Sequence, residues 1–265
     1  MTAGDVAARI EEDLRSRGSV LVAFSGGVDS GVVAALARRA VGERALAVTA
    51  AAETLAGREL DRARSLACEI GIEHEVLTYS ELDNAEFVAN PSFRCYVCQG
   101  MRMDAMIELG AGRGFATICD GTNASDPGPD RPGLAAIRER GVTSPLLEHG
   151  VDKSATREIA RHLGLSVWDR PANACLSSRI PHGQSVTATK LRRVEAAEEL
   201  LLERGFRVVR VRHDSGRARV EVGFGELAAA HSVWPELAGA IVDLGFSSAV
   251  LDSRGYRSGG ANAPG

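Results

Sequence analysis

The sequence predicts a parallel-sheet α/β domain followed by a smaller α+β domain. Short apolar runs alternate with helical patterns in the first part of the chain, which is typical of right-handed βαβ units. A glycine-rich turn joins the first apolar run to the helix that follows it. Beyond residue 180, an alternating hairpin pattern flanked by helices replaces this repeat. We therefore expect a first domain over residues 1–180 and a second over residues 181–265.

Each expected element of the first domain is predicted from a hydrophobic pattern or a stop signal. Val6, Ile10 and Leu14 recur at helical spacing before Gly18, which ends that helix. Further helical patterns cover 31–42, 56–70 and 152–164, with another from about residue 101. Apolar runs predict strands over 19–24, 44–50, 75–79 and 115–120, and a short strand over 142–145.

Two segments interrupt this alternation, and the second domain follows them. Residues 84–99 and 169–183 carry prolines and small polar residues, so irregular backbone is expected in both. The second domain then begins with a long helical pattern over 188–204. Its remaining elements are strands over 207–213 and 217–223, helices over 226–231 and 234–244, and a last strand over 248–252.

The composition excludes several classes of protein. The 265 residues carry a net charge of −4, which supplies no general attraction for nucleic acid. No apolar run approaches the roughly 20 residues of a membrane span. The first residues lack the basic and apolar regions of a signal peptide, so a cytoplasmic protein is expected. The five cysteines are an odd number and argue against a disulfide scaffold.

The glycine-rich turn is a candidate anion site. The stretch from Val22 to Ser30 reads V-A-F-S-G-G-V-D-S, which is an apolar strand, a tight turn and a helix start in that order. Backbone N–H groups at such a turn point toward a ligand, and the helix dipole adds partial positive charge. The turn is not a Walker A loop, because no lysine follows the glycines. The alternative is an ordinary strand–turn–helix joint.

A second polar loop follows the strand that ends at residue 120. Asp120-Gly-Thr-Asn123 stands at the carboxyl end of that strand, where ligands of parallel sheets gather. Asp29, Asp126 and Asp130 are candidate ligands for Mg²⁺, which takes one or two carboxylates together with phosphate oxygens. For any one of these aspartates, turn or cap chemistry is the alternative.

Three cysteines lie in the two irregular segments. Cys95 and Cys98 form a C-x-x-C motif, and Cys175 lies in the later segment. Three thiolates can hold a [4Fe–4S] cluster with one iron open. The alternative is a structural zinc site, which needs a fourth ligand such as His182.

Cys175 is also a candidate nucleophile by itself. Arg179 follows it closely in sequence, and nearby positive charge favours the reactive thiolate. The alternative is a structural cysteine in a loop. Cys68 and Cys119 lie in an expected helix and an expected strand, so both are expected to be small buried residues.

The expected hairpin of the second domain carries four arginines on one face. They are Arg210 and Arg212 on one strand and Arg217 and Arg219 on the other. Arginine binds phosphate bidentately, so this face is a candidate site for a small phosphorylated substrate. Nearby acidic side chains are few, namely Asp214 and Glu221, so we expect a face that is not simply self-neutralised. The alternative is a solvated outer face.

These motifs together resemble the LarE family of ATP-dependent sacrificial sulfur transferases. The family belongs to the pyrophosphate-loop ATP pyrophosphatases, whose Rossmann-like fold is called adenine nucleotide alpha hydrolase-like. The resemblance covers nearly the whole chain. Its motifs are Ser25-Gly-Gly-Val-Asp-Ser30, Asp120-Gly-Thr-Asn123, Arg131-Pro-Gly133, Ser144-Pro-Leu146, Ala174-Cys-Leu-Ser-Ser-Arg179, Arg210-Val-Arg212 and Gly255-Tyr-Arg-Ser-Gly259.

The resemblance implies a reaction and a set of site residues. Family members adenylate a carboxylate of pyridinium-3,5-biscarboxylic acid mononucleotide with ATP and Mg²⁺ and convert it into a thiocarboxylate. This step belongs to the synthesis of the nickel-pincer nucleotide of lactate racemase-type enzymes. Cys175 and Arg179 would be catalytic, and Arg210 and Arg212 would hold the substrate phosphate. The residues expected to bind ATP are Ser25, Gly26, Gly27, Asp29, Ser30, Asp120, Gly121 and Asn123.

The source of the sulfur has two readings. In the single-cysteine form of the family, the residue matching Cys175 gives up its sulfur and becomes dehydroalanine. Relatives with three cysteines carry a [4Fe–4S] cluster whose open iron presents sulfide. Cys95 and Cys98 place the chain in that subgroup, so cluster-mediated transfer with Cys175 as a ligand is expected. Sulfide or a cysteine desulfurase is the expected donor, and a homo-oligomer is expected.

Two other classes of function are weighed against this one. A tRNA thiolase shares the loop and the cysteines, but the pI of about 5.9 and the absence of a tRNA-binding appendage disfavour it. A nucleotide- or metal-binding regulator would bind ATP without turnover. An ammonia-dependent amidotransferase or NAD synthetase gives no reason for three loop cysteines.

Overall fold

The computed structural model describes residues 2–126, 132–171 and 174–257. Two compact units make up the chain. The first comprises Met1–Ser80 and Cys95–Asn173, and the second comprises Glu81–Arg94 and Ala174–Gly265. These units are defined by compactness, and a domain boundary near residue 180 stays a prediction.

The first unit contains a parallel sheet of four strands, as the sequence predicts. Its order is β3-β2-β1-β4. The strands are β1 (Val20–Ala23), β2 (Ala45–Ala51), β3 (Glu73–Thr78) and β4 (Thr117–Cys119). The expected strand at 142–145 is wrong, because only an isolated bridge from Cys119 to Thr143 forms there. Pro145 has no N–H to donate and instead begins a helix.

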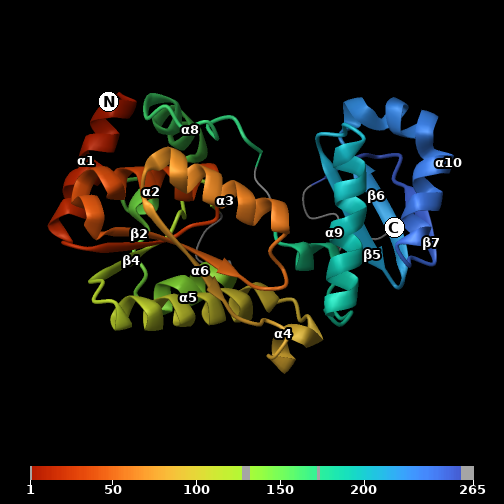
Figure 1. Ribbon diagram of the computed structural model, residues 1–265, viewed down its shortest axis with the longest axis horizontal. Helices are drawn as coiled ribbons and strands as arrows, with labels where there is room; N and C mark the ends of the chain where they lie inside the picture. Colours follow the sequence, from red (N-terminus) through yellow and green to blue (C-terminus); the bar gives the residue numbers. More distant parts are fainter. Residues whose placement is uncertain (1, 127–131, 172–173, 258–265) are drawn as a thin grey trace. The chain divides into compact units, whose positions relative to one another are not determined.

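Helices cover both faces of this sheet (Figure 1). Side chains of β1 and of five helices share one core, in which Ile10, Leu36 and Ile159 are fully buried. Met103 and Met106 pack with Leu21 and Leu46 in a second core on the other face. The helices of the unit are α1 (Ala3–Ser16), α2 (Val28–Val41), η1 (Gly42–Arg44), α3 (Gly57–Ile70), α5 (Arg94–Gly112), α6 (Pro132–Glu139), α7 (Pro145–Glu148) and α8 (Lys153–His162). Within the described ranges, no helix is long and apolar enough to span a bilayer.

The strand order places the two polar loops side by side. β1 and β4 are neighbours, although a crossover through β2 and β3 separates them in the chain. The crevice at such a switch point, outside the carboxyl ends of the strands, is where α/β sheets bind ligands. The glycine turn follows β1 and Asp120 follows β4, so both loops open at this crevice.

The segment 84–99 is largely helical, which corrects the expectation of irregular backbone. α4 (Ala85–Ala89) is capped by Asn84, whose Oδ1 accepts the N–H groups of Glu86 and Phe87. α5 then starts at Arg94, seven residues earlier than the expected residue 101. Cys95 and Cys98 therefore lie in the first turns of α5 and not in a loop.

The second unit is built around a sheet of order β5-β6-β7. β5 (Val209–Asp214) and β6 (Arg217–Val222) form the predicted hairpin, with Ser215 and Gly216 at positive φ as its two-residue turn. β7 (Ser248–Leu251) pairs with β6 in parallel. The helical elements of this unit are α4, η2 (Leu176–Arg179), α9 (Ala188–Glu203), η3 (Phe224–Glu226) and α10 (Leu227–Asp243).

α10 is one helix where the sequence predicts two. Pro235 lies inside it and removes one backbone hydrogen bond, which is why the pattern reads as a break. Ala230, Leu237 and Ile241 are nevertheless fully buried along one face of the helix. Burial of this continuous face offsets the lost bond.

Asn90 ties the 81–94 segment to the rest of the second unit. The Asn90 Nδ2 donates to the carbonyl oxygens of Pro181 (2.7 Å) and Gln184 (2.8 Å). The backbone carbonyl of Asn90 accepts the N–H of Gly183 at 2.9 Å. Asn90 has φ +56°, a left-handed conformation that asparagine tolerates better than most residues. A fully buried side chain thus carries the connection.

Replacing Asn90 by alanine leaves the Pro181 and Gln184 carbonyl groups without this donor and strains a left-handed backbone. We expect N90A to lower the free energy of unfolding by about 1–3 kcal/mol. Urea unfolding followed by circular dichroism measures the effect, with the exposed Glu86→Ala on α4 as the matched control. Equal stability of the two variants would contradict this role.

Candidate active site

The loop after β1 has the geometry of an anion cradle. Gly26 adopts φ +69°, and a Cβ there would lie 2.7 Å from the Cα of Ala63 on α3, so conformation and space both require glycine. Gly27 is the N-cap of α2 and has no side chain to occupy the N–H groups of the first turn. The Ser30 Oγ lies 3.1 Å from the Ser25 Oγ and accepts the Ser25 N–H at 3.2 Å. These bonds fold the loop around the N-terminus of α2.

Asp29 joins this loop to two other segments of the first unit. Its Oδ1 accepts a hydrogen bond from Asn123 Nδ2 at 3.2 Å, and its Oδ2 forms an ion pair with Lys153. Lys153 begins α8, and its backbone N–H donates to the Ser125 Oγ. Lys153 could not be predicted from the sequence, because no motif surrounds it. The loop therefore has an ammonium group beside it as well as backbone donors.

The loop after β4 packs directly on the first loop. A Cβ on Gly121 would lie 2.7 Å from the backbone nitrogen of Ser30. Asp120 is buried, and its carboxylate accepts hydrogen bonds from Ser144 Oγ (2.6 Å) and from the Thr122 N–H (3.2 Å). Burial raises the pKa of Asp120, and these hydrogen bonds oppose that rise. The buried Asp120 carboxylate thus fixes the conformation of the loop, and the Asn123 side chain donates a hydrogen bond to Asp29.

Asp126 contributes to the turn that presents Asn123. Its Oδ2 accepts the backbone N–H of Asn123 at 3.0 Å, which is the turn chemistry weighed as the alternative to a metal ligand. Asp130 lies outside the described residues, as does Arg131. Over the described parts of the chain, no group of three or more His, Cys, Asp or Glu side chains is placed to hold a metal ion.

Cys175 lies in a loop that a buried arginine holds. The Cys175 Sγ is 3.2 Å from the Ser177 Oγ, and the residue is half-buried at the start of η2. Arg179 is fully buried and donates to the carbonyl oxygens of Ala174 (2.7 Å) and Cys175 (2.9 Å). Its Nε and Nη2 donate to both oxygens of Glu198 at 2.8 and 3.0 Å. In this structure Arg179 therefore positions the Cys175 loop, and Glu198 on α9 neutralises its charge.

Three of the four arginines of the hairpin face are paired with carboxylates. Arg212 is buried and donates to Glu221, Arg219 pairs with Glu221 and Asp252, and Arg217 pairs with Asp214. The expectation that the face is not self-neutralised is therefore wrong for these three. Asp252 follows β7, far from the hairpin in sequence, so its contribution could not be read from the pattern.

Arg210 differs from its neighbours. It forms no ion pair among the described residues, donates to its neighbour's carbonyl at Val209, and lies 5.1 Å from the ring centroid of Tyr256. Burial lowers the pKa of Arg210, and the positive charge of Arg179 lowers it further. The Arg212 Nη1 donates to the Ser178 carbonyl at 3.2 Å, so the arginine face and the Cys175 loop lie together in the second unit.

The other cysteines occupy contrasting environments. Cys95 is exposed and Cys98 is buried, and the Arg102 Nη2 lies 3.7 Å from the Cys98 Sγ. Cys119 is fully buried as predicted, and burial raises its pKa to about 12. Cys68 is exposed, which corrects the expectation of a buried residue. It lies on the solvent side of α3, whose buried face is formed by Ala63, Leu66 and Ala67.

His182, the candidate fourth ligand, belongs to the second unit with Cys175, whereas Cys95 and Cys98 belong to the first. Burial lowers the pKa of His182, and the positive charge of Arg94 adds to the effect. Arg94 in turn donates to the Ser177 carbonyl at 3.0 Å and supports the Cys175 loop from the 81–94 segment. His182 thus favours the neutral form that donates a lone pair to a metal.

A parallel sheet with a glycine loop before α2 and a second loop at the switch point defines an ATP pyrophosphatase of the pyrophosphate-loop class. In agreement, residues 5–96 match the asparagine synthase family. An uncharacterized protein of Synechocystis is 40% identical over 91% of this chain and 91% of its own length. Pyridinium-3,5-bisthiocarboxylic acid mononucleotide synthase of Lactiplantibacillus plantarum is 34% identical over 92% of this chain and 88% of its own length. The tRNA-specific 2-thiouridylase of Rhizorhabdus wittichii is 28% identical over 68% of this chain and 57% of its own length.

These similarities identify the family. The chain belongs to the LarE family, which includes the Lactiplantibacillus plantarum synthase. It is therefore an enzyme of the sulfur-transferring branch of the pyrophosphate-loop proteins.

Lys153 supplies the first prediction at this site. We expect K153M to weaken ATP binding about tenfold, because an ammonium group close to bound phosphates is lost. Titration calorimetry with ATP measures the dissociation constant. K190M is the matched control, since Lys190 donates to the Ser185 carbonyl in the second unit. Unchanged ATP affinity in K153M would show that the lysine only pairs with Asp29.

Asp252 supplies a prediction about pH. Hydrogen bonds from Arg254 hold the pKa of Asp252 well below its ordinary value. The stability that Asp252 contributes is therefore fully present above its unfolded-state pKa of about 3.9 and is lost as the pH falls below it. We expect D252N to lower the free energy of unfolding by about 1–3 kcal/mol at pH 7, and by less as the pH approaches 3.

Urea unfolding at several pH values between neutral and acid measures this difference. The exposed Asp243→Asn on α10 is the control, because it changes the same charge without a buried partner. A D252N deficit that stays constant across the pH range would contradict the assignment of the effect to the carboxylate charge.

Proposed function

We propose that the chain adenylates a carboxylate of pyridinium-3,5-biscarboxylic acid mononucleotide and converts it into a thiocarboxylate during nickel-pincer nucleotide biosynthesis. The observation that carries the proposal is the meeting of the two polar loops, where Gly121 lies against the Ser30 nitrogen. The 34% identity to the Lactiplantibacillus plantarum synthase, over 92% of this chain, supports the substrate.

The first unit performs the adenylation. The glycine loop and the N-terminus of α2 hold the β- and γ-phosphates, with the N–H groups of the first turn as donors. A substrate carboxylate oxygen attacks the α-phosphorus, and the bond to the pyrophosphate oxygen breaks. Asp29 and Asp126 would hold Mg²⁺, which would neutralise the charge of the phosphates. Lys153 stands beside Asp29 and adds positive charge on the same side.

The second unit holds the substrate. Arg210 is the arginine of the hairpin face that has no carboxylate partner among the described residues, which supports a role in binding the mononucleotide phosphate. Arg212 is held by Glu221 and the Ser178 carbonyl, so it presents a fixed guanidinium beside Arg210. The cation–π contact with Tyr256 orients the Arg210 guanidinium before the substrate phosphate binds.

The sulfur is carried by the cysteines. The donor set of Cys95, Cys98 and Cys175 suits a [4Fe–4S] cluster, because none of the three is in a disulfide and two of them lie one helical turn apart on α5. When bound, such a cluster supplies sulfide at its open iron. In the other route the Cys175 thiolate attacks the adenylate carbonyl and AMP leaves. A base then removes the Cα proton of Cys175, the Cβ–S bond breaks, and the thiocarboxylate leaves dehydroalanine behind. We favour the cluster route.

Other properties of the enzyme belong to the same proposal. Its sulfur donor is sulfide or a cysteine desulfurase, and it acts as a homo-oligomer. None of the five cysteines is in a disulfide, which supports a reducing compartment, so the proposed location is the cytoplasm. The tRNA thiolase alternative has weaker support, because the Rhizorhabdus wittichii thiouridylase is matched over only 57% of its length.

Anaerobic turnover with ATP and pyridinium-3,5-biscarboxylic acid mononucleotide tests the reaction. We expect pyrophosphate release and a thiocarboxylate product by mass spectrometry, with bulk tRNA unable to replace the substrate. Release of no pyrophosphate with this substrate would contradict the proposed function.

The sulfur route is tested on the same samples. We expect iron and acid-labile sulfide in wild-type protein and in C68A, the matched control, but not in C95A, C98A or C175A. The wild-type chain should keep its mass after turnover. A chain that contains no iron and loses the mass of hydrogen sulfide at Cys175 would overturn the cluster route in favour of sacrifice.

A further inference from the structure

A chain of hydrogen bonds crosses from β3 through β2 to the residue before the glycine loop. That residue is Phe24, which follows β1 and precedes Ser25. The Thr49 hydroxyl on β2 donates to the Phe24 carbonyl oxygen at 2.7 Å. The same hydroxyl oxygen lies 2.8 Å from Nε2 of His74 on β3. Thr49 is only 2% exposed, so these bonds are shielded from solvent.

The proton positions in this chain follow from the donors that each group has. A threonine hydroxyl has one proton, and the Thr49 proton goes to the Phe24 carbonyl. The hydrogen bond between Thr49 and His74 is therefore donated by the Nε2–H. Burial lowers the pKa of His74, and the positive charge of Arg64 lowers it further, so the ring is neutral and Nε2 carries its single proton. His74 thus fixes the orientation of the Thr49 hydroxyl.

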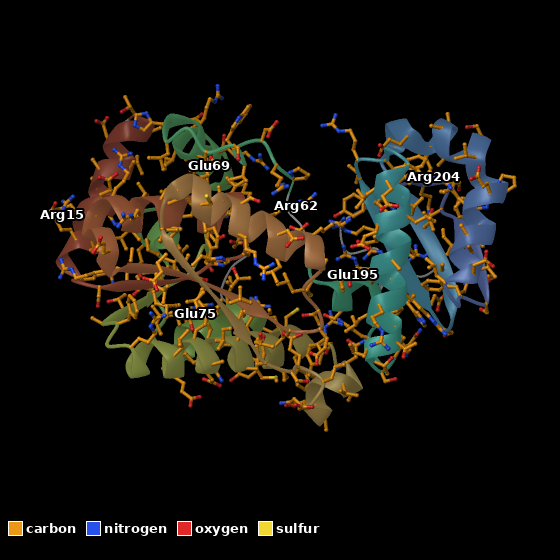
Figure 2. All side chains as sticks on the ribbon, viewed as in Figure 1. Arg15, Arg62, Glu69, Glu75, Glu195 and Arg204 are labelled. Carbon is orange, nitrogen blue, oxygen red and sulfur yellow. The ribbon has the colours of Figure 1, made fainter. Side chains whose placement is uncertain are left out.

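His74 lies on the face of the sheet that α3 covers. Its ring meets the Phe24 ring edge to face, with the centroids 5.7 Å apart, and Phe24 shares a core with Leu66 of α3. The next residue on β3, Glu75, is labelled in Figure 2 and pairs with Arg113, which directly follows α5. Successive side chains of a strand point to opposite faces, in agreement with this division. The hydrogen-bond chain therefore reaches the loop from the α3 side.

The peptide group between Phe24 and Ser25 is held at both ends. The Ser25 N–H donates to the Ser30 Oγ at 3.2 Å in the first turn of α2, whereas the Phe24 carbonyl accepts from Thr49. In a trans peptide the N–H and the carbonyl point in opposite directions. The partial negative charge of the carbonyl oxygen is therefore turned away from the N-terminus of α2. A rotation of this peptide would turn that oxygen toward bound phosphates and repel them.

We propose that Thr49 and His74 are positioning residues of the ATP site, which keep the Phe24 carbonyl oxygen turned away from the triphosphate. The inference rests on the proposed function, in which the glycine loop holds the β- and γ-phosphates. In this role neither side chain contacts the nucleotide, because Thr49 acts through the backbone before the loop and His74 acts through Thr49. The effect grows with the negative charge at the loop, so it is large for ATP and small for AMP.

Titration calorimetry with ATP and with AMP tests this role without turnover. T49V removes the hydroxyl at nearly constant volume, and we expect it to weaken ATP binding about tenfold and AMP binding by less than about twofold. T49S keeps a hydroxyl and should restore ATP affinity to near the wild-type value. Thr78→Val is the matched control, because Thr78 is exposed at the end of β3.

The part played by His74 is tested by combining two substitutions. H74F keeps an aromatic ring and removes the N–H, and we expect it to weaken ATP binding about threefold. Added to T49V, it should cause no further loss, because His74 acts through the Thr49 hydroxyl. Thermal unfolding verifies that each variant is folded, and H74F decides the question if T49V does not fold.

Three results would overturn the assignment. Wild-type ATP affinity in T49V and H74F would mean that the hydrogen-bond chain does not act on the loop. An equal loss of ATP and AMP affinity would mean that Thr49 only stabilises the fold, and additive losses in the double variant would mean that His74 does not act through Thr49. These measurements need neither the pyridinium substrate nor sulfur. Their failure is therefore distinct from failure of the proposed function, which is measured by pyrophosphate release.

Discussion

The close packing of backbone around the glycine loop is the constraint on which the first unit depends. Gly26 leaves no room for a side chain against α3, and Gly121 leaves none against the Ser30 nitrogen. Interiors are packed too densely to absorb a misplaced methyl group at such contacts. The loop, α3 and the segment after β4 therefore hold one another in place. Because no side chain caps the first turn of α2, its backbone N–H groups are available to a ligand.

In the second unit, buried ion pairs hold the candidate site residues in place. Arg179 with Glu198 and Arg212 with Glu221 are almost completely removed from solvent. Breaking one such pair leaves an uncompensated buried charge, which is costly. The pairs fix the Cys175 loop and one side of the arginine face, while Arg210 keeps its guanidinium without a carboxylate partner among the described residues. Arg210 is therefore the guanidinium that we propose binds the anionic substrate.

Local patterns predicted most of the fold, since apolar runs and glycine stops set the four parallel strands and the hairpin. They also brought Asp29 and Asn123 to one edge of the sheet, because both follow the carboxyl ends of neighbouring strands. Local patterns did not predict contacts between residues that lie far apart in the sequence. Lys153 reaches Asp29 across 124 residues, and Asp252 reaches Arg219 across 33. The helical start at Arg94 and the unbroken α10 were missed because tertiary packing outweighs local propensity.

We propose that the glycine loop activates a carboxylate by adenylation and does not transfer a γ-phosphoryl group. Isotope exchange between labelled pyrophosphate and ATP tests this mechanism, because exchange requires a reversible adenylate. We expect exchange that depends on the pyridinium mononucleotide, together with AMP as the nucleotide product of full turnover. Formation of ADP and inorganic phosphate, with no exchange in the presence of this substrate, would contradict it.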